Sequence, residues 1–214
     1  MDNVLKKPWA WIILIGAVVA GIILYSGGVE FKKNEEDVAL KVNETTFTHV
    51  QFNELLSLVR ENSDDYGAST DEEIKNEAIN VAVQQALLLE HADQIGLGAT
   101  KEEIDLKLEQ FMTENEIEEE DLFDITGATR KELEDYFEMD IKVNNLFNYY
   151  AEGVVVTDEE IDEAYALYSL QSNVPALEEI KEDIRRILIE NKVTSVLLSK
   201  VEELKEDAKI EIFF

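Results

Sequence analysis

The chain has 214 residues, enough for a membrane anchor followed by one domain with a hydrophobic core. It has no cysteine, which excludes disulfides, thiolate metal sites and cysteine catalysis. Its net charge of −29, from 48 acidic and 19 basic residues, leaves no basic face for nucleic acid. The acidity favours a solvated surface that keeps the protein soluble, and the alternative is attraction of basic polypeptide segments or cations.

The first hydrophobic segment runs from Trp9 to Tyr25 and carries no charge over 17 residues. Two lysines precede it, and aromatic residues stand at both of its ends. We expect residues 1–28 to be an uncleaved signal anchor, with a transmembrane helix over about 8–26. The lysines predict a cytoplasmic N-terminus and an extracytoplasmic body on the outer face of the cytoplasmic membrane. A cleaved signal peptide is the alternative, with Ser26–Gly28 as a weak cleavage site.

Residues 29–37 are a polar linker, and the body of the protein is predicted to span 38–214. It should begin with two short strands, Val38–Val42 and Thr45–Phe47, followed by a helix that starts at Thr48. The segment Thr70–Ile95 should be the central helix, because it is apolar almost all round in its middle. Gly96 and Gly98 are predicted to end it.

Five helix starts share one signal, a threonine followed three residues later by Glu or Gln. This is the spacing of a capping box, in which each side chain satisfies a backbone N–H at the helix start. The pairs are Thr48/Gln51, Thr70/Glu73, Thr100/Glu103, Thr129/Glu132 and Thr157/Glu160. We interpret them as structural caps.

The later helices differ in their apolar patterns. The helix after Thr100 has one stripe, whereas Arg130–Tyr150 has two, which predicts burial between two neighbours or an open groove. The remaining expected elements are a short helix over 119–125, a helix over 158–170, a long helix over 175–207 and a strand over 208–214. A terminal strand needs a partner, so the two ends of the body should meet in a small sheet.

The sequence offers no visible catalytic or metal-binding motif. His49 and His91 lie far apart without ligand spacing, and we interpret both as ordinary surface or boundary residues. No phosphate loop, nucleophile elbow or zinc motif is present. We therefore expect no cofactor, no metal and no small-molecule substrate.

The order of these elements resembles a known family. The segments IGLGATKEEID, GATRKELEDYFEMDIKVNNLF and VVVTDEEIDEAY are similar to the N-terminal domain of SurA-type and PrsA-type extracytoplasmic chaperones, which share a helical cradle with trigger factor. The resemblance covers about residues 37–168, and the tail over 175–214 is similar to the segment that closes the same domain. It implies a mainly α fold with a small β-sheet. The sequence VNET at 42–45 departs from the family by lacking a turn glycine.

A second departure concerns catalysis. Many members of the family carry a parvulin-type prolyl isomerase domain between the helix over 158–170 and the closing helix. Here the gap is only the few residues 169–174, too short for a domain. We therefore expect no isomerase activity.

The resemblance implies a membrane-anchored chaperone that holds unfolded or newly translocated polypeptides without ATP. Its client surface would be apolar. Our candidates for that surface, each of which is also a candidate core residue, are Phe111, Met112, Phe123, Tyr136 and Met139. The alternative function is a membrane-tethered scaffold for one specific partner protein.

Overall fold

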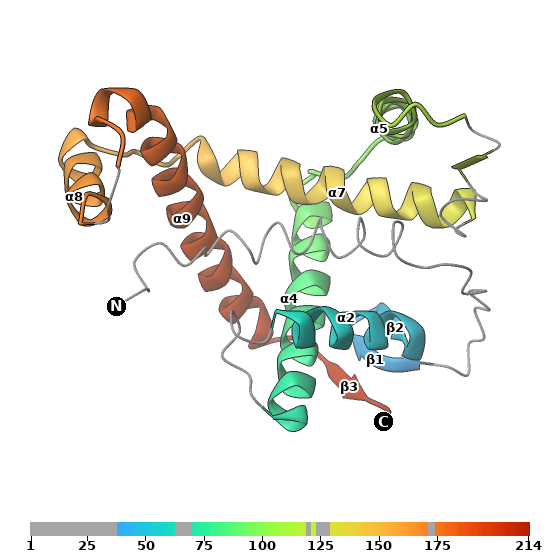
Figure 1. The fold of residues 1–214 in the computed structure, drawn as a ribbon. Helices are drawn as coiled ribbons and strands as arrows, with labels where there is room; N and C mark the ends of the chain where they lie inside the picture. Colours follow the sequence, from blue (N-terminus) through green and yellow to red (C-terminus); the bar gives the residue numbers. More distant parts are fainter. Residues whose placement is uncertain (1–37, 63–69, 119–120, 123–128, 171–173) are drawn as a thin grey trace.

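The computed structural model describes residues 38–62, 70–118, 121–122, 129–170 and 174–214. The predicted anchor over 1–28 and linker over 29–37 lie outside these residues. Among the described helices, none combines the length and apolar character that crossing a membrane requires. The described part is mainly helical, with one small sheet (Figure 1). Its elements are β1 (Val38–Val42), β2 (Thr45–Thr48), α2 (His49–Glu61), α4 (Asp71–Gln94), α5 (Lys101–Glu114), α7 (Arg130–Ala151), α8 (Asp158–Tyr168), α9 (Leu177–Lys205) and β3 (Ile210–Ile212).

The sheet joins the two ends of the body, as the sequence predicts. Its strand order is β2-β1-β3, and both pairs are antiparallel, with Leu40 opposite Ile212. Asn43, in the turn between β1 and β2, strengthens this junction. Its backbone N–H donates to the carbonyl of Lys209 at 2.8 Å, and its Oδ1 accepts from the Lys209 N–H at 2.9 Å. Its Nδ2 donates to Glu90 on α4 at 2.7 Å. Asn43 therefore connects the β1–β2 hairpin, the residue just before β3 and the central helix.

Helix α4 is the central helix, which confirms the prediction from its apolar middle. It packs against α2, α7, α9 and β1, and its residues from Val81 to Leu88 supply much of the main core. Gly96 ends it in the left-handed conformation, at φ 78°. The Leu97 N–H then donates to the carbonyl of Ala92 at 2.8 Å, which completes a Schellman motif.

All five predicted capping boxes form. At each helix start the threonine hydroxyl accepts from the backbone N–H three residues on, and the Glu or Gln side chain accepts from the threonine N–H. Each box satisfies donors that a helix start otherwise leaves open, and a cap of this kind typically contributes about 1 kcal/mol. The structural interpretation of these residues is confirmed.

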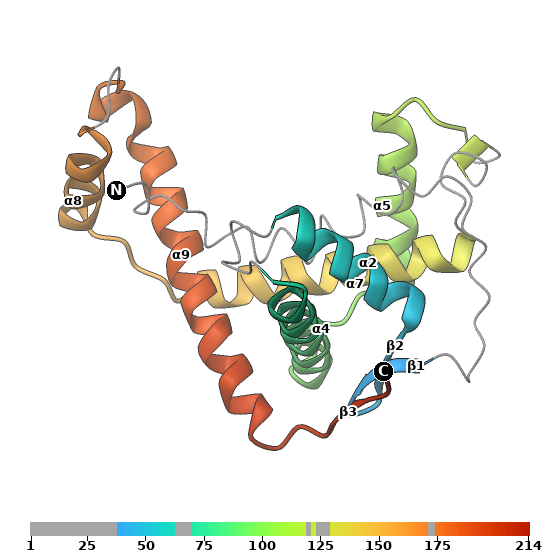
Figure 2. The ribbon, with the colours of Figure 1, turned by 60° about the horizontal axis from the view of Figure 1, so that its bottom comes forward.

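Figure 2 shows two arms that rise from opposite sides of a base. The base comprises the sheet, α2, α4 and the C-terminal half of α9, and it holds the main core. We call α5 with the N-terminal half of α7 the α5 arm, and α8 with the N-terminal half of α9 the α8 arm. Each arm has a small core of its own. Helix α7 runs from the α5 arm, across α4, to α9 (Figures 1 and 2).

Several element boundaries differ from the predicted ones. The long helix starts at Leu177, so Pro175 precedes the cap residue Ala176 instead of lying in the first turn. The Pro175 carbonyl accepts a hydrogen bond from the Tyr165 hydroxyl at 3.0 Å. The helix has 29 residues and is about 43 Å long. The last strand has only three residues, Ile210–Ile212, which pair with Leu40–Val42 of β1. Most of the short helix predicted over 119–125 lies outside the described residues, although Asp121 and Leu122 are helical.

Candidate functional site

The α5 arm has a small core with a half-buried apolar rim. Leu108 of α5 packs against Leu122 and against Leu133 and Phe137 of α7. The Phe111 ring lies 5.8 Å from the Phe137 ring, measured between centroids. The partly buried residues around this core are Ile104, Phe111, Met112, Ile117 and Tyr136. Four fully buried side chains are few for an independent core, so this rim holds a large share of the apolar surface of the arm.

The structure brings together three of the five predicted client-binding residues. Phe111, Met112 and Tyr136 share the rim of the α5 arm. Met139 lies elsewhere on α7, where its Sδ accepts a hydrogen bond from Gln85 Nε2 of α4 at 2.6 Å. Phe123 lies outside the described residues. The role of these residues in client binding remains a prediction.

Helix α7 contributes to two different cores, which divide it along its length. Leu133 and Phe137 pack in the α5 arm, whereas Leu146 is buried in the main core. This confirms the prediction of a helix packed between two neighbours. The alternative, an open groove, now concerns only the half-buried side chains of α7 between the two cores.

Three exposed leucines on the two arms were missed from the sequence. Leu106 of α5 is 55% exposed, and Leu167 and Leu170, at the end of α8, are 50% and 82% exposed. Leu106 is out of phase with the stripe that contains Leu108, and Leu167 is out of phase with Ile161. An apolar residue on the polar side of an amphipathic helix is therefore the sequence signal that could have identified Leu106 and Leu167 as exposed.

The α8 arm is held together by ion pairs around its small core. Val156, Ile161 and Ile184 are buried there. Lys192 Nζ of α9 lies 2.6 Å from Glu160 Oε1 of α8 and donates to the Val155 carbonyl at 2.8 Å. Two hydrogen bonds lower the pKa of Glu160. The larger effect comes from the Lys192 ammonium, and the second comes from the Thr157 backbone N–H. These contacts fix the orientation of α8 on α9 and leave Leu167 and Leu170 on the outside.

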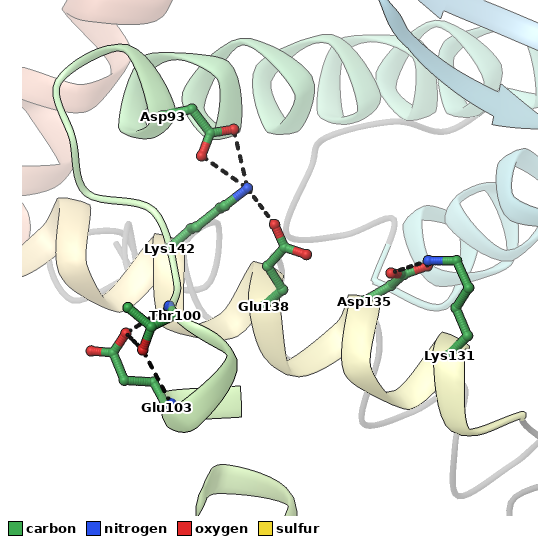
Figure 3. Close-up of polar contacts among 7 residues, drawn as sticks. All are labelled: Asp93, Thr100, Glu103, Lys131, Asp135, Glu138 and Lys142. Carbon is green, nitrogen blue, oxygen red and sulfur yellow. Dashed lines mark hydrogen bonds and ion pairs between the residues drawn. The ribbon is translucent and has the colours of Figure 1, made fainter. Parts of the chain in front are cut away.

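Lys142 attaches the α5 arm to the base (Figure 3). Its side chain is only 13% exposed, and its Nζ lies 2.9 Å from Asp93 Oδ1 of α4 and 2.6 Å from Glu138 Oε1 of α7. Burial by itself lowers the pKa of Lys142, but the hydrogen bonds and charges of Glu138 and Asp93 outweigh it and raise the pKa. The lysine therefore stays charged and links α7 to the end of α4. Lys107 Nζ, 3.0 Å from Asp140 Oδ2, ties α5 to α7 in turn.

His91 is a buried structural residue, which corrects the expectation of a surface or boundary position. It is 8% exposed, and its Nε2 lies 2.8 Å from the Tyr150 hydroxyl of α7. Burial lowers its pKa, and the positive charge of Lys200 on α9 lowers it further. His91 thus joins α4 to α7 in its neutral form. Within the described ranges, no group of acidic and histidine side chains is arranged to hold a metal ion.

Taken together, these features describe a surface suited to binding. Two arms with small cores expose apolar side chains, and both are fixed to one base by paired charges. Such partly exposed apolar surface favours contact with apolar segments of other polypeptides.

The comparisons with known proteins identify the family of the chain. No curated protein matches it. The family model described as SurA-like N-terminal domain matches residues 2–132, which include β1, β2, α2, α4, α5 and the start of α7. This domain is the chaperone-type module of such proteins and is distinct from their isomerase domain. The match covers more than half of the chain, so the chain belongs to the family of proteins with a SurA-like N-terminal domain.

Proposed function

We propose that this protein is an ATP-independent holdase, which binds unfolded or newly translocated polypeptides on the apolar surfaces of its two arms. The observation that carries the proposal is the pair of arms, each with a small core and exposed apolar surface, in a chain of a chaperone-type family. Burial of apolar client surface would contribute about 25 cal/mol per Å² before the cost of ordering the client.

Aggregation of a chemically unfolded client tests this function. The full-length chain would be reconstituted in phospholipid nanodiscs, and light scattering would follow aggregation after the client is diluted from denaturant. Nanodiscs that carry only residues 1–37 are the control. Aggregation should fall as the amount of full-length chain rises, and it should not fall when the control nanodiscs are added. Equal scattering in both would contradict the proposal.

Substitutions on the arms connect this activity to the surface. Leu106→Ser together with Leu167→Ser and Leu170→Ser should weaken suppression, because it removes exposed apolar area from both arms. Exposed sites contribute little to folding, so the unfolding midpoint should hardly change. Val196→Ser with Leu198→Ser is the matched control, since both residues are 41% exposed on the half of α9 that belongs to the base. Loss of suppression in this control instead of the arm variant would move the client site to the base.

The proposed location is the outer face of the cytoplasmic membrane, with residues 8–26 as the anchor. The absence of cysteine makes a topology test simple, because one introduced cysteine is the only thiol. Ser199→Cys, which is exposed, should react with a membrane-impermeant maleimide in intact cells, and Asn3→Cys should react only after lysis. The opposite labelling pattern would overturn the orientation.

We also propose that the protein lacks prolyl isomerase activity. Only eight residues, 169–176, separate α8 from α9, where related chaperones carry the isomerase domain. A peptide assay of proline isomerisation should give the uncatalysed rate.

A single tight partner of fixed stoichiometry, found together with failure to protect unfolded clients, would support the scaffold alternative.

A further inference from the structure

The basic residues of the α5 arm are largely used inside the arm. Between Thr100 and Lys142 there are five basic and sixteen acidic residues. Four of the five basic side chains are in ion pairs within the arm or with the base, namely Lys107 with Asp140, Arg130 with Glu134, Lys131 with Asp135, and Lys142 with Glu138 and Asp93. Most of the positive charge of the arm is therefore compensated by carboxylates of the arm or by Asp93 of the base.

A set of carboxylates remains without compensation beside the apolar rim. Five exposed glutamates of the arm have no ion pair or side-chain hydrogen bond with any residue that the structure describes: Glu102, Glu109, Glu114, Glu116 and Glu118. Glu102 and Glu109 lie one helical turn on either side of exposed Leu106, and Glu116 and Glu118 flank Ile117 of the rim. Apolar contact surface and unpaired negative charge thus occur on the same arm.

We propose that the α5 arm selects unfolded segments in which lysine or arginine residues are interspersed among apolar ones. This inference rests on the proposed holdase function and adds the chemical class of its clients. Apolar side chains of such a segment would cover Leu106, on the face of α5 opposite the rim, and its cationic side chains would pair with Glu102 and Glu109 beside it. At the end of the arm the same segment would meet Ile117 of the rim between Glu116 and Glu118. A segment of the same apolar content with acidic side chains would meet repulsion at the same positions, so the arm discriminates by charge as well as by hydrophobicity.

The test compares three fluorescent peptides that share their apolar residues and differ at interspersed positions, which carry lysine, glutamine or glutamate. Anisotropy would report their binding to the full-length chain in nanodiscs. The lysine peptide should bind about tenfold more tightly than the glutamine peptide, and the glutamate peptide more weakly still. The preference should narrow as salt rises from about 50 mM to about 300 mM, because the screening length falls below about 10 Å.

Matched variants separate local charge from the net charge of the protein. Glu102→Gln with Glu109→Gln and Glu118→Gln should weaken the lysine peptide about tenfold and leave the glutamine peptide within about twofold. The control removes three exposed carboxylates from the α8 arm, by Glu159→Gln with Glu163→Gln and Glu178→Gln. Circular dichroism would confirm that both variants fold.

The outcomes distinguish the inference from the function beneath it. Equal binding of the three peptides, or an equal loss in both triple variants, would overturn charge selection by the α5 arm while leaving the holdase function in place. Failure of every peptide to bind, together with no suppression of aggregation, would overturn the proposed function itself.

Discussion

Glu116 adopts a backbone conformation that L-residues other than asparagine rarely take. It follows α5 with φ 55°, and the Ile117 N–H donates to the Met112 carbonyl at 2.9 Å in a Schellman motif. Glycine usually takes this position, because a Cβ makes the left-handed conformation cost about 1 kcal/mol. Glu116→Gly should therefore stabilise the end of α5 and slow amide exchange there about fivefold. Hydrogen exchange followed by mass spectrometry measures this.

Gly96 provides the matched control for Glu116, since it takes the same position after α4. Its φ is 78°, and a Cβ added there would meet no atom within 4 Å. Gly96→Ala should thus lower the free energy of unfolding by about 1 kcal/mol through backbone strain alone. Faster exchange in Glu116→Gly would show that the carboxylate contributes more to the helix end than its backbone conformation costs.

Glu54 on α2 makes the stability of the protein depend on pH. Burial, together with the smaller effect of the negative charge of Glu132, raises the pKa of Glu54 to about 7. Its pKa when folded lies above the unfolded value of 4.5, so the folded state binds more protons between these values. The contribution of Glu54 to stability is complete below pH 4.5 and is lost as the pH rises through about 7.

Glu54→Gln removes this dependence. The variant should be more stable than the parent at pH 8 by about 1 kcal/mol, a value reduced from the full shift because the side chain is only half-buried. At pH 4 the two should be alike. Urea denaturation at both pH values measures the difference, with Glu109→Gln, which is exposed in the middle of α5, as control. A parent that gains stability from pH 4 to 8 relative to the variant would contradict the assignment.

Two lysines of α7 form ion pairs of different kinds: one links two helices, and the other is a local pair on the surface. Lys142 is nearly buried between Asp93 and Glu138, whereas Lys131 is 75% exposed and pairs with Asp135 one turn away (Figure 3). Lys142→Met should cost about 1–2 kcal/mol of unfolding free energy, since it leaves two carboxylates together at the junction of α4 and α7. Lys131→Met should cost less than about 0.5 kcal/mol. Thermal and urea unfolding measure both, and equal costs would show that Lys142 does not hold the arm.

The elements themselves were predicted well where a signal is local. Each capping box needs only two side chains three residues apart, so all five helix starts could be identified from Thr48 to Thr157. The start of α9 was placed two residues early, because Ala176 makes no side-chain cap and Pro175 is equally at home before a helix. Helix ends without a cap signal were also predicted less well. Helix α8, expected over 158–170, ends at Tyr168.

For the whole molecule, the two arms should open more readily than the base. Each arm buries only three or four side chains in its own core, whereas α4 is covered by helices and the sheet. Amides of α5 and α8 should exchange at least about tenfold faster than those of α4 in native conditions. Hydrogen exchange of the full-length chain would measure this, and uniform protection would show that arms and base unfold as one unit.

The candidate site was predicted in part. Phe111, Met112 and Tyr136 were chosen from composition, and they do lie together on the α5 arm. Met139 was not separable from them by sequence, since its contact is Gln85, more than 50 positions away. Leu106, Leu167 and Leu170 were passed over because residues outside a stripe are treated as scattered surface, and only the packing shows which of them lie on an arm.

The sequence by itself determined the helix starts, their caps, the central place of α4 and the meeting of the two ends of the body in one sheet. Periodicity and capping are set by neighbouring residues, and a terminal strand has few possible partners. The tertiary structure alone decided that α7 serves two cores, that His91 is buried against Tyr150, and that most basic side chains of the α5 arm are paired while several of its glutamates have no ion pair with the described residues. Those properties depend on which distant side chains meet, and a pattern along one chain does not specify the contacts between its elements.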